Sequence, residues 1–125
     1  GQTNYGAAKV GIGAFSIICA QELGRYGVRS NCIAPAARTR LTEATPGLGE
    51  MVAPPKEGFD VWDPANVSPL VAYLATADCR ITGRTFFAQG GTVRVLEPWH
   101  LGERLERDGR WTIEDLAAEV PKIWS

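Results

Sequence analysis

A long stretch of mixed apolar and small residues, followed at once by a short strand-like run, most constrains the fold of this chain. Within residues 4–23 large apolar side chains recur among alanines and glycines, and Gly24 closes the pattern, which predicts one long and largely buried helix. Residues 28–34 then predict a strand that ends at Pro35. Because a strand directly after a long helix is typical of a βαβ crossover, we predict an α/β protein with a parallel sheet.

The middle of the chain predicts a long loop and then a capped helix. Residues 40–60 are rich in proline and glycine, which predicts an irregular, mobile loop. We interpret this loop as a lid over a substrate rather than a disordered excursion, because it directly follows the loop after the first strand. Asp63 caps the next helix, with Pro64 at its first position, and the helix runs to about Thr76. Four of its apolar side chains are expected to face inward: Val67, Leu70, Val71 and Leu74.

Two further strand segments precede a change in composition. Residues 85–88 and 92–96 predict strand structure on either side of a Gly-Gly pair. At about Glu97 the composition shifts. We therefore divide the chain into a domain at residues 1–96 and a C-terminal extension at residues 97–125.

The extension carries a second capped helix and three tryptophans. The helix is predicted from Thr112 to about Val120, and Thr112 with Asp115 resembles a capping box. The tryptophans are Trp99, Trp111 and Trp124. We expect the extension to pack on the domain or on a neighbouring subunit, and the alternative is that the tryptophans line a substrate entrance.

Composition excludes several classes of function. The 125 residues are 45% hydrophobic, enough for a core, and the formal net charge of −1 provides no basic surface for nucleic acid. We expect no membrane span and no signal peptide, because no apolar run approaches ~20 residues. Cys19, Cys32 and Cys79 lack Cys-x-x-Cys spacing, which indicates buried thiols in a reducing, cytoplasmic compartment. With His100 as the one histidine, no metal site is expected.

Tyr5 and Lys9 stand four residues apart on the predicted long helix. This spacing places both side chains on one face, about 6 Å apart at the backbone. A free phenol has a pKa of about 10, but a neighbouring cation stabilises the phenolate and makes such a group useful as an acid or base at neutral pH. The ammonium can also donate hydrogen bonds to a sugar diol. The alternative, an exposed pair of ordinary helix residues, is the commoner meaning of an isolated Tyr-x-x-x-Lys.

Small residues leave little side-chain bulk on one side of the first three turns of this helix. They are Gly6, Ala7, Ala8, Gly11 and Gly13. A neighbouring surface can therefore approach closely. That surface is either the sheet of the same chain or a partner subunit, and the sequence favours neither.

An ordered set of motifs accompanies the Tyr5–Lys9 pair. The motifs are GVRSNCIAP at residues 27–35, then Thr39, then DPANV at 63–67, ITGRTFF at 81–87 and the glycine pair at 90–91. In this order and spacing they resemble the second half of a short-chain dehydrogenase/reductase, over about residues 1–96. The resemblance implies a Rossmann-like, doubly wound parallel sheet, of which this chain would form the C-terminal half.

The resemblance also implies a site. Tyr5 would exchange a proton with the substrate oxygen, and Lys9 would hold the ribose of a bound NAD or NADP. The loop that leaves the first strand, where ligands bind in open α/β sheets, would contact the cofactor through Pro35, Ala36, Ala37, Arg38 and Thr39. In the family its backbone groups meet the nicotinamide carboxamide and the threonine hydroxyl meets the phosphates. Many members have glycine in place of Ala36, and this loop is about one residue shorter than the common form.

Two features of the family pattern do not occur in the sequence: the Gly-rich dinucleotide turn and a serine upstream of the tyrosine. Only four residues precede Tyr5, the chain opens on Gly1, and its one methionine is Met51. The Gly-x-Gly patterns at residues 11–13 and 47–49 do not join a strand to a helix, so we interpret them as structural. We expect the chain to be a fragment of a larger enzyme whose N-terminal nucleotide-binding half is absent, and to be inactive alone.

The function implied by the resemblance is hydride transfer between nicotinamide and a hydroxy or keto group. The segments at 33–35 with 40–42, and at 66–71 with Leu74, look most similar to the (3R)-hydroxyacyl-CoA dehydrogenase part of the multifunctional enzymes of β-oxidation. A small-molecule substrate of the acyl-CoA or steroid type is therefore expected, in a homo-oligomer. With an acyl-CoA, Arg38, Arg40 or Lys56 should lie near its phosphates.

Two alternatives stay open at this point. The first is a 3-oxoacyl-carrier-protein reductase, because motif similarity of this length defines a substrate weakly. The second is a non-catalytic α/β piece that only associates with other chains, since an apolar strand without a neighbour on each side invites pairing.

Overall fold

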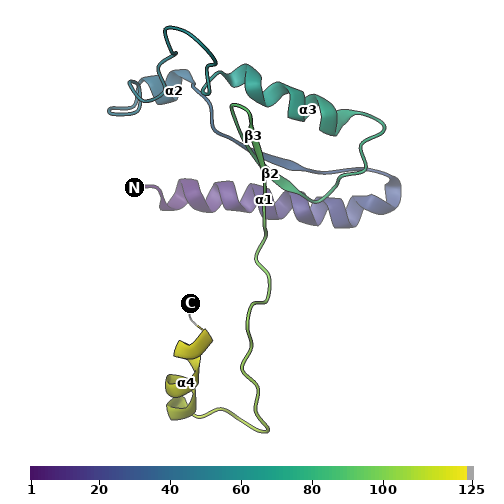
Figure 1. The fold of residues 1–125 in the computed structure, drawn as a ribbon. Helices are drawn as coiled ribbons and strands as arrows, with labels where there is room; N and C mark the ends of the chain where they lie inside the picture. The colour runs from purple at the N-terminus through teal and green to yellow at the C-terminus, as the bar shows by residue number, and fades with distance from the viewer. Residues whose placement is uncertain (124–125) are drawn as a thin grey trace.

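A small sheet with a long helix on one side and a shorter helix on the other forms the main part of the computed structural model of the chain, which describes residues 1–123 (Figure 1). The helices are α1 (Thr3–Leu23), α2 (Arg40–Glu43), α3 (Ser68–Ala75) and α4 (Ile113–Glu119). The strands are β1 (Cys32–Pro35), β2 (Thr85–Gln89) and β3 (Thr92–Leu96). Short 3₁₀ segments occupy η1 (Gly24–Tyr26), η2 (Pro64–Val67) and η3 (Val120–Ile123). Trp124, one of the tryptophans expected to pack with the extension, lies outside the described residues.

The three strands form one mixed sheet in the order β1-β2-β3. β1 and β2 are parallel, with Cys32 opposite Thr85, as the helix-strand pattern predicts. The prediction of a parallel sheet is wrong for β3, which runs antiparallel to β2. A two-residue turn folds the chain back at Gly90, whose φ of +53° is accessible to glycine at little cost. Such a short connection can only join antiparallel strands.

Helices α1 and α3 lie on opposite sides of this sheet (Figure 1). On the α1 side, the Ser16 and Ser30 hydroxyls are 3.0 Å apart. Phe86 and Ala88 are buried, and they face the other side because side chains alternate along a strand and Thr85 lies against α1. The segment η2 lies next to β2.

The long helix forms where the sequence predicts it, but it is not largely buried. Within α1 only Ser16 and Ala20 are buried, and its large apolar side chains are exposed by half or more: Val10, Ile12, Phe15 and Ile18. A sheet of three short strands covers one side of the helix over its second half and reaches no further. Val71 in α3 is also exposed, whereas Val67, Leu70 and Leu74 are half-buried.

The ends of the helices follow the predicted capping chemistry. α1 tightens into η1, and Gly27 with φ +73° ends the helical path three residues later than Gly24. Asp63 caps η2 by accepting from the Ala65 N–H at 2.8 Å. The predicted single helix from there to Thr76 is instead η2 followed by α3, because Pro69 has no N–H to continue an α-helical ladder.

The extension beyond β3 leads away from the sheet (Figure 1). α4 begins at Thr112 with both hydrogen bonds of the predicted capping box to Asp115. Arg107 pairs with Asp115 and lies 5.3 Å from the centre of the Trp111 ring. Trp99 is 95% exposed, so it does not pack on the sheet or helices within residues 1–123. In the same residues, no helix combines the length and hydropathy needed to cross a bilayer.

Candidate functional site

Tyr5 and Lys9 lie on the exposed first turns of α1. The Lys9 Nζ is 5.3 Å from the centre of the Tyr5 ring, so the two side chains share one face of the helix, as their spacing predicts. The Tyr5 side chain is 58% exposed. A bound molecule can therefore reach the phenol and the ammonium together.

The direction of α1 brings this pair level with the carboxyl ends of the parallel strands. The helix runs antiparallel to β2: a Cβ built on Gly83, ahead of the strand, lies 3.4 Å from Ala20, and one built on Gly13 lies 3.9 Å from Thr85 at its start. Tyr5 lies about 12 Å further along α1 than Gly13 at ~1.5 Å per residue. The four steps from Thr85 to Gln89 in β2 extend about 13 Å at ~3.3 Å each, a similar distance. In open α/β sheets ligands bind at this carboxyl edge.

The loop after β1 leaves from the same edge, at the left of Figure 1. The Ala36 N–H donates to the Ala88 carbonyl (2.9 Å), and the Arg38 N–H donates to the Trp62 carbonyl (2.7 Å). Two of the backbone donors predicted to meet the cofactor are thus used within the protein. The Ala37 N–H between them makes no hydrogen bond within residues 1–123. Pro35 has no N–H to offer.

Thr39 caps α2 and keeps its hydroxyl near the surface. Its Oγ1 accepts from the Thr42 N–H at 3.2 Å, and its own N–H donates to Thr42 Oγ1 at 2.8 Å. The hydroxyl oxygens of the two threonines are 3.3 Å apart, a long contact for such a pair. A phosphate oxygen could take the place of Thr42 Oγ1 as the acceptor for the Thr39 hydroxyl. The hydrogen bond from the Thr42 N–H that caps the helix would remain.

Arg38 differs from the expectation that its charge lies free for a phosphate. Its Nη2 lies 2.5 Å from Asp60 Oδ2, and its Nη1 donates to the Val52 carbonyl at 2.8 Å. The hydrogen bond from Arg38 lowers the pKa of Asp60 below its usual range. Arg40 and Lys56 are exposed. Asp60 was not predicted from the sequence, and no local signal could have found it, since its partner lies 22 residues away.

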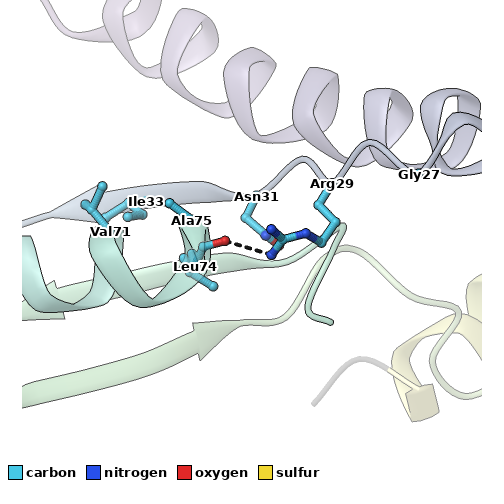
Figure 2. Close-up of a pocket in the computed structure, with 7 residues that line it drawn as sticks. All are labelled: Gly27, Arg29, Asn31, Ile33, Val71, Leu74 and Ala75. Carbon is cyan, nitrogen blue, oxygen red and sulfur yellow. Dashed lines mark hydrogen bonds between the residues drawn. The ribbon is translucent and has the colours of Figure 1, made fainter. Parts of the chain in front are cut away.

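The hollow shown in Figure 2 lies away from this edge. It has a volume of about 370 Å³ and is lined by Gly27, Arg29, Asn31, Ile33, Val71, Leu74 and Ala75. Its polar side chains already bind the protein itself. Arg29 donates to the carbonyls of Leu74 and Thr76 (2.8 Å each), and Asn31 donates to that of Ile81 (2.8 Å). We interpret the hollow as structural, with Arg29 holding the end of α3.

We expect Arg29→Ala to lower the free energy of unfolding by about 1–3 kcal/mol, because charge-assisted bonds to the last carbonyls of a helix are lost. Urea unfolding followed by circular dichroism measures the change. Arg80→Ala, at an exposed position, serves as the control and should shift stability by less than about 0.5 kcal/mol. Equal effects of the two substitutions would contradict the role of Arg29.

Metal-binding side chains are not gathered anywhere in residues 1–123, where no three of His, Cys, Asp and Glu come together as a set of ligands. Cys19, Cys32 and Cys79 are free thiols.

Comparison with known proteins places this geometry in a family. A family model described as enoyl-(acyl carrier protein) reductase matches residues 1–93. A solved short-chain dehydrogenase from Mycobacterium avium superposes with a TM-score of 0.78 at 38% identity, over 98% of this chain and 37% of the other. The chain belongs to the short-chain dehydrogenase/reductase family. The resemblance stated from its motifs is thereby confirmed.

Two curated relatives of this short-chain dehydrogenase/reductase carry related names. Hydroxyacyl-CoA dehydrogenase ChsB1 of Mycobacterium tuberculosis is 39% identical over 124 residues, which are 96% of this chain and 38% of the relative. Human (3R)-3-hydroxyacyl-CoA dehydrogenase is 37% identical over 98 residues, which are 73% of this chain and 36% of the relative. The chain thus spans less than two fifths of the length of these relatives.

Proposed function

We propose that the chain supplies the catalytic helix and cofactor loop of an NAD(P)-dependent oxidoreductase that acts on the hydroxy or keto group of an acyl-CoA. The shared face of Tyr5 and Lys9 on α1, whose first turns point toward the edge from which the loop at residues 35–39 leaves, supports this proposal. The names of the two relatives support the substrate class.

The donors at this edge suit a dinucleotide. Lys9 offers an ammonium for a ribose diol, Ala37 an N–H for a carboxamide, and Thr39 a hydroxyl for a phosphate. A bound NAD or NADP supplies the hydride chemistry. Tyr5 holds the proton that moves to or from the substrate oxygen, and Lys9 stabilises the phenolate that remains.

We further propose that these residues work inside a longer, Rossmann-like doubly wound domain that supplies the pyrophosphate-binding turn. The length of the relatives supports this, as does β1, which pairs with β2 and with no second strand within residues 1–123. In this proposal residues 1–96 belong to that domain, residues 97–125 form its C-terminal extension, and the enzyme is a homo-oligomer. The three free cysteines support a cytoplasmic location.

Two other functions differ from this one in what they require. A 3-oxoacyl-carrier-protein reductase would share Tyr5 and Lys9 and act on a carrier-linked acyl chain, a class of substrate that the description of the matching family model favours. A non-catalytic associating piece would need neither residue. Activity measured with acyl-CoA and with acyl-carrier-protein substrates distinguishes the proposed dehydrogenase from the 3-oxoacyl-carrier-protein reductase.

Cofactor titration of the 125-residue chain and of the intact enzyme tests the proposal. We expect the chain alone to bind neither NAD nor NADP at micromolar concentration, since no strand, Gly-rich turn and helix that could hold the pyrophosphate follow one another within residues 1–123. The intact enzyme should bind one of the two and oxidise a (3R)-hydroxyacyl-CoA. Micromolar binding by the isolated chain in calorimetry would refute the proposal that a longer domain supplies the pyrophosphate-binding turn. An intact protein that binds neither cofactor would refute the proposed activity.

A further inference from the structure

Hydrogen bonds close the long loop at residues 39–59 at its base. The Arg38 guanidinium spans the two ends of the loop and pairs with Asp60 through both carboxylate oxygens, at 2.5 and 3.4 Å. A backbone hydrogen bond also joins the two ends of the loop, since the Arg38 N–H donates to the Trp62 carbonyl. Asp60 Oδ1 also accepts from the Trp62 N–H (3.0 Å), and the Asp60 carbonyl accepts from Asn66 (2.8 Å). We call Arg38, Asp60, Trp62 and Asn66 the loop base.

The pair at the loop base is shielded from water. The side chains of Arg38 and Asp60 are 16% and 18% exposed. The same guanidinium donates to the carbonyl of Val52, a buried residue of the loop itself. Glu43 also approaches Arg38, but at 3.8 Å and with a side chain that is 52% exposed. Asp60 is therefore the principal partner of Arg38, since exposed and distant ion pairs contribute little.

The loop base lies next to the donors assigned to the cofactor. Ala37 and Thr39 flank Arg38 in sequence, and the N–H of Ala36 is fixed on the Ala88 carbonyl. The Ala37 N–H is thus held between two anchored residues, one on the sheet and one at the loop base. Loss of the anchor at Arg38 leaves residues 37–39 attached only through Ala36 on the sheet and the Thr39 cap of α2.

We propose that Arg38 and Asp60 are positioning residues, which fix the Ala37 N–H and the Thr39 hydroxyl in the geometry that binds the cofactor. This inference rests on the proposed function. No hydrogen bond or ion pair joins either residue to Tyr5 or Lys9 within residues 1–123, so we expect the pair to affect cofactor binding and not proton transfer.

Asp60→Asn in the intact enzyme separates an effect on cofactor binding from an effect on proton transfer. We expect the cofactor Kd to rise about tenfold, because a charge-assisted pair becomes a neutral contact and the loop loses its fixed geometry. At saturating cofactor, kcat should stay within about twofold of the parent value. Fluorescence titration and steady-state kinetics measure the two quantities. A fall in kcat with unchanged cofactor Kd would overturn the proposal.

Glu43→Gln is the matched control, because it neutralises the other carboxylate near the same guanidinium. It should change the cofactor Kd by less than about twofold. The exchange Arg38→Asp with Asp60→Arg should recover part of the affinity that Arg38→Asp alone loses. An effect of Glu43→Gln as large as that of Asp60→Asn, or no recovery in the exchanged protein, would count against a specific pair.

Hydrogen exchange tests the loop base without any cofactor. The Arg38 amide, bonded to Trp62, should exchange faster in Asp60→Asn than in the parent, whereas the amides of α1 should not change. Equal exchange would overturn the proposal. If Asp60→Asn fails to fold, Asp60→Glu keeps the charge on a longer side chain and should show a smaller change in the same direction. A protein that binds neither NAD nor NADP but shows the change in exchange would refute the proposed function alone.

Discussion

Tyr5→Phe in the intact enzyme is expected to lower kcat by about 10²-fold or more while leaving cofactor binding nearly unchanged. The substitution removes the phenolic hydroxyl and preserves the ring, which the Lys9 ammonium approaches at 5.3 Å. Because Tyr5 is exposed on α1, stability should change little. Steady-state kinetics and cofactor titration measure the two effects. Near-normal turnover would show that the pair is structural.

Lys9→Met provides the contrast to this substitution. The ammonium has two proposed tasks, holding the ribose and stabilising the phenolate, so its loss should weaken cofactor binding and lower kcat together. Methionine keeps an unbranched side chain of similar length. If only the cofactor affinity or only kcat falls in this variant, Lys9 has one of the two proposed tasks and not both.

The isolated 125-residue chain is expected to self-associate. Its α1 leaves Val10, Ile12, Phe15 and Ile18 exposed, and every residue of β3 is exposed. Within residues 1–123 few hydrophobic residues are buried: Ala20, Val52, Cys79, Phe86 and Ala88. An apolar helix face and an open strand edge of this kind bind other copies of the chain. Size-exclusion chromatography with light scattering should show oligomers or aggregates at micromolar concentration.

A charge on the exposed helix face supplies the control for this prediction. Phe15→Asp should reduce self-association, and Lys56→Glu, on the exposed part of the 40–60 loop, should not. A sharp monomer with cooperative thermal unfolding in the parent chain would contradict the prediction.

Local features were predictable from the sequence where local chemistry decides them. α1, the two strands around Gly90 and the helix caps at Asp63 and Thr112 depend on residues within a few positions of each other. The face shared by Tyr5 and Lys9 follows from helix geometry alone. The sequence therefore sufficed to assign the candidate site to one helix and one loop.

The remaining features depend on partners distant in sequence. Hydrophobicity predicted a buried α1, but burial is decided by how much sheet lies beside the helix, and three strands cover only part of it. The role of Arg38 depends on Asp60, whose carboxylate the chain brings back only after a long loop. A charged residue in a predicted cofactor loop is compatible with phosphate binding and with an internal ion pair. The sequence alone could not distinguish these two roles for Arg38.

The closed loop base has an evolutionary consequence. When the two ends of a loop are bonded to each other, a change of length between them does not move the elements outside it. Each doubling of loop length costs only about 0.6 kcal/mol of chain entropy. Residues 53–59, which are all exposed, can therefore accept insertions and deletions, whereas Val52 is buried and accepts a hydrogen bond from Arg38. Descendants of this chain could therefore vary this exposed stretch while the loop base stays in place.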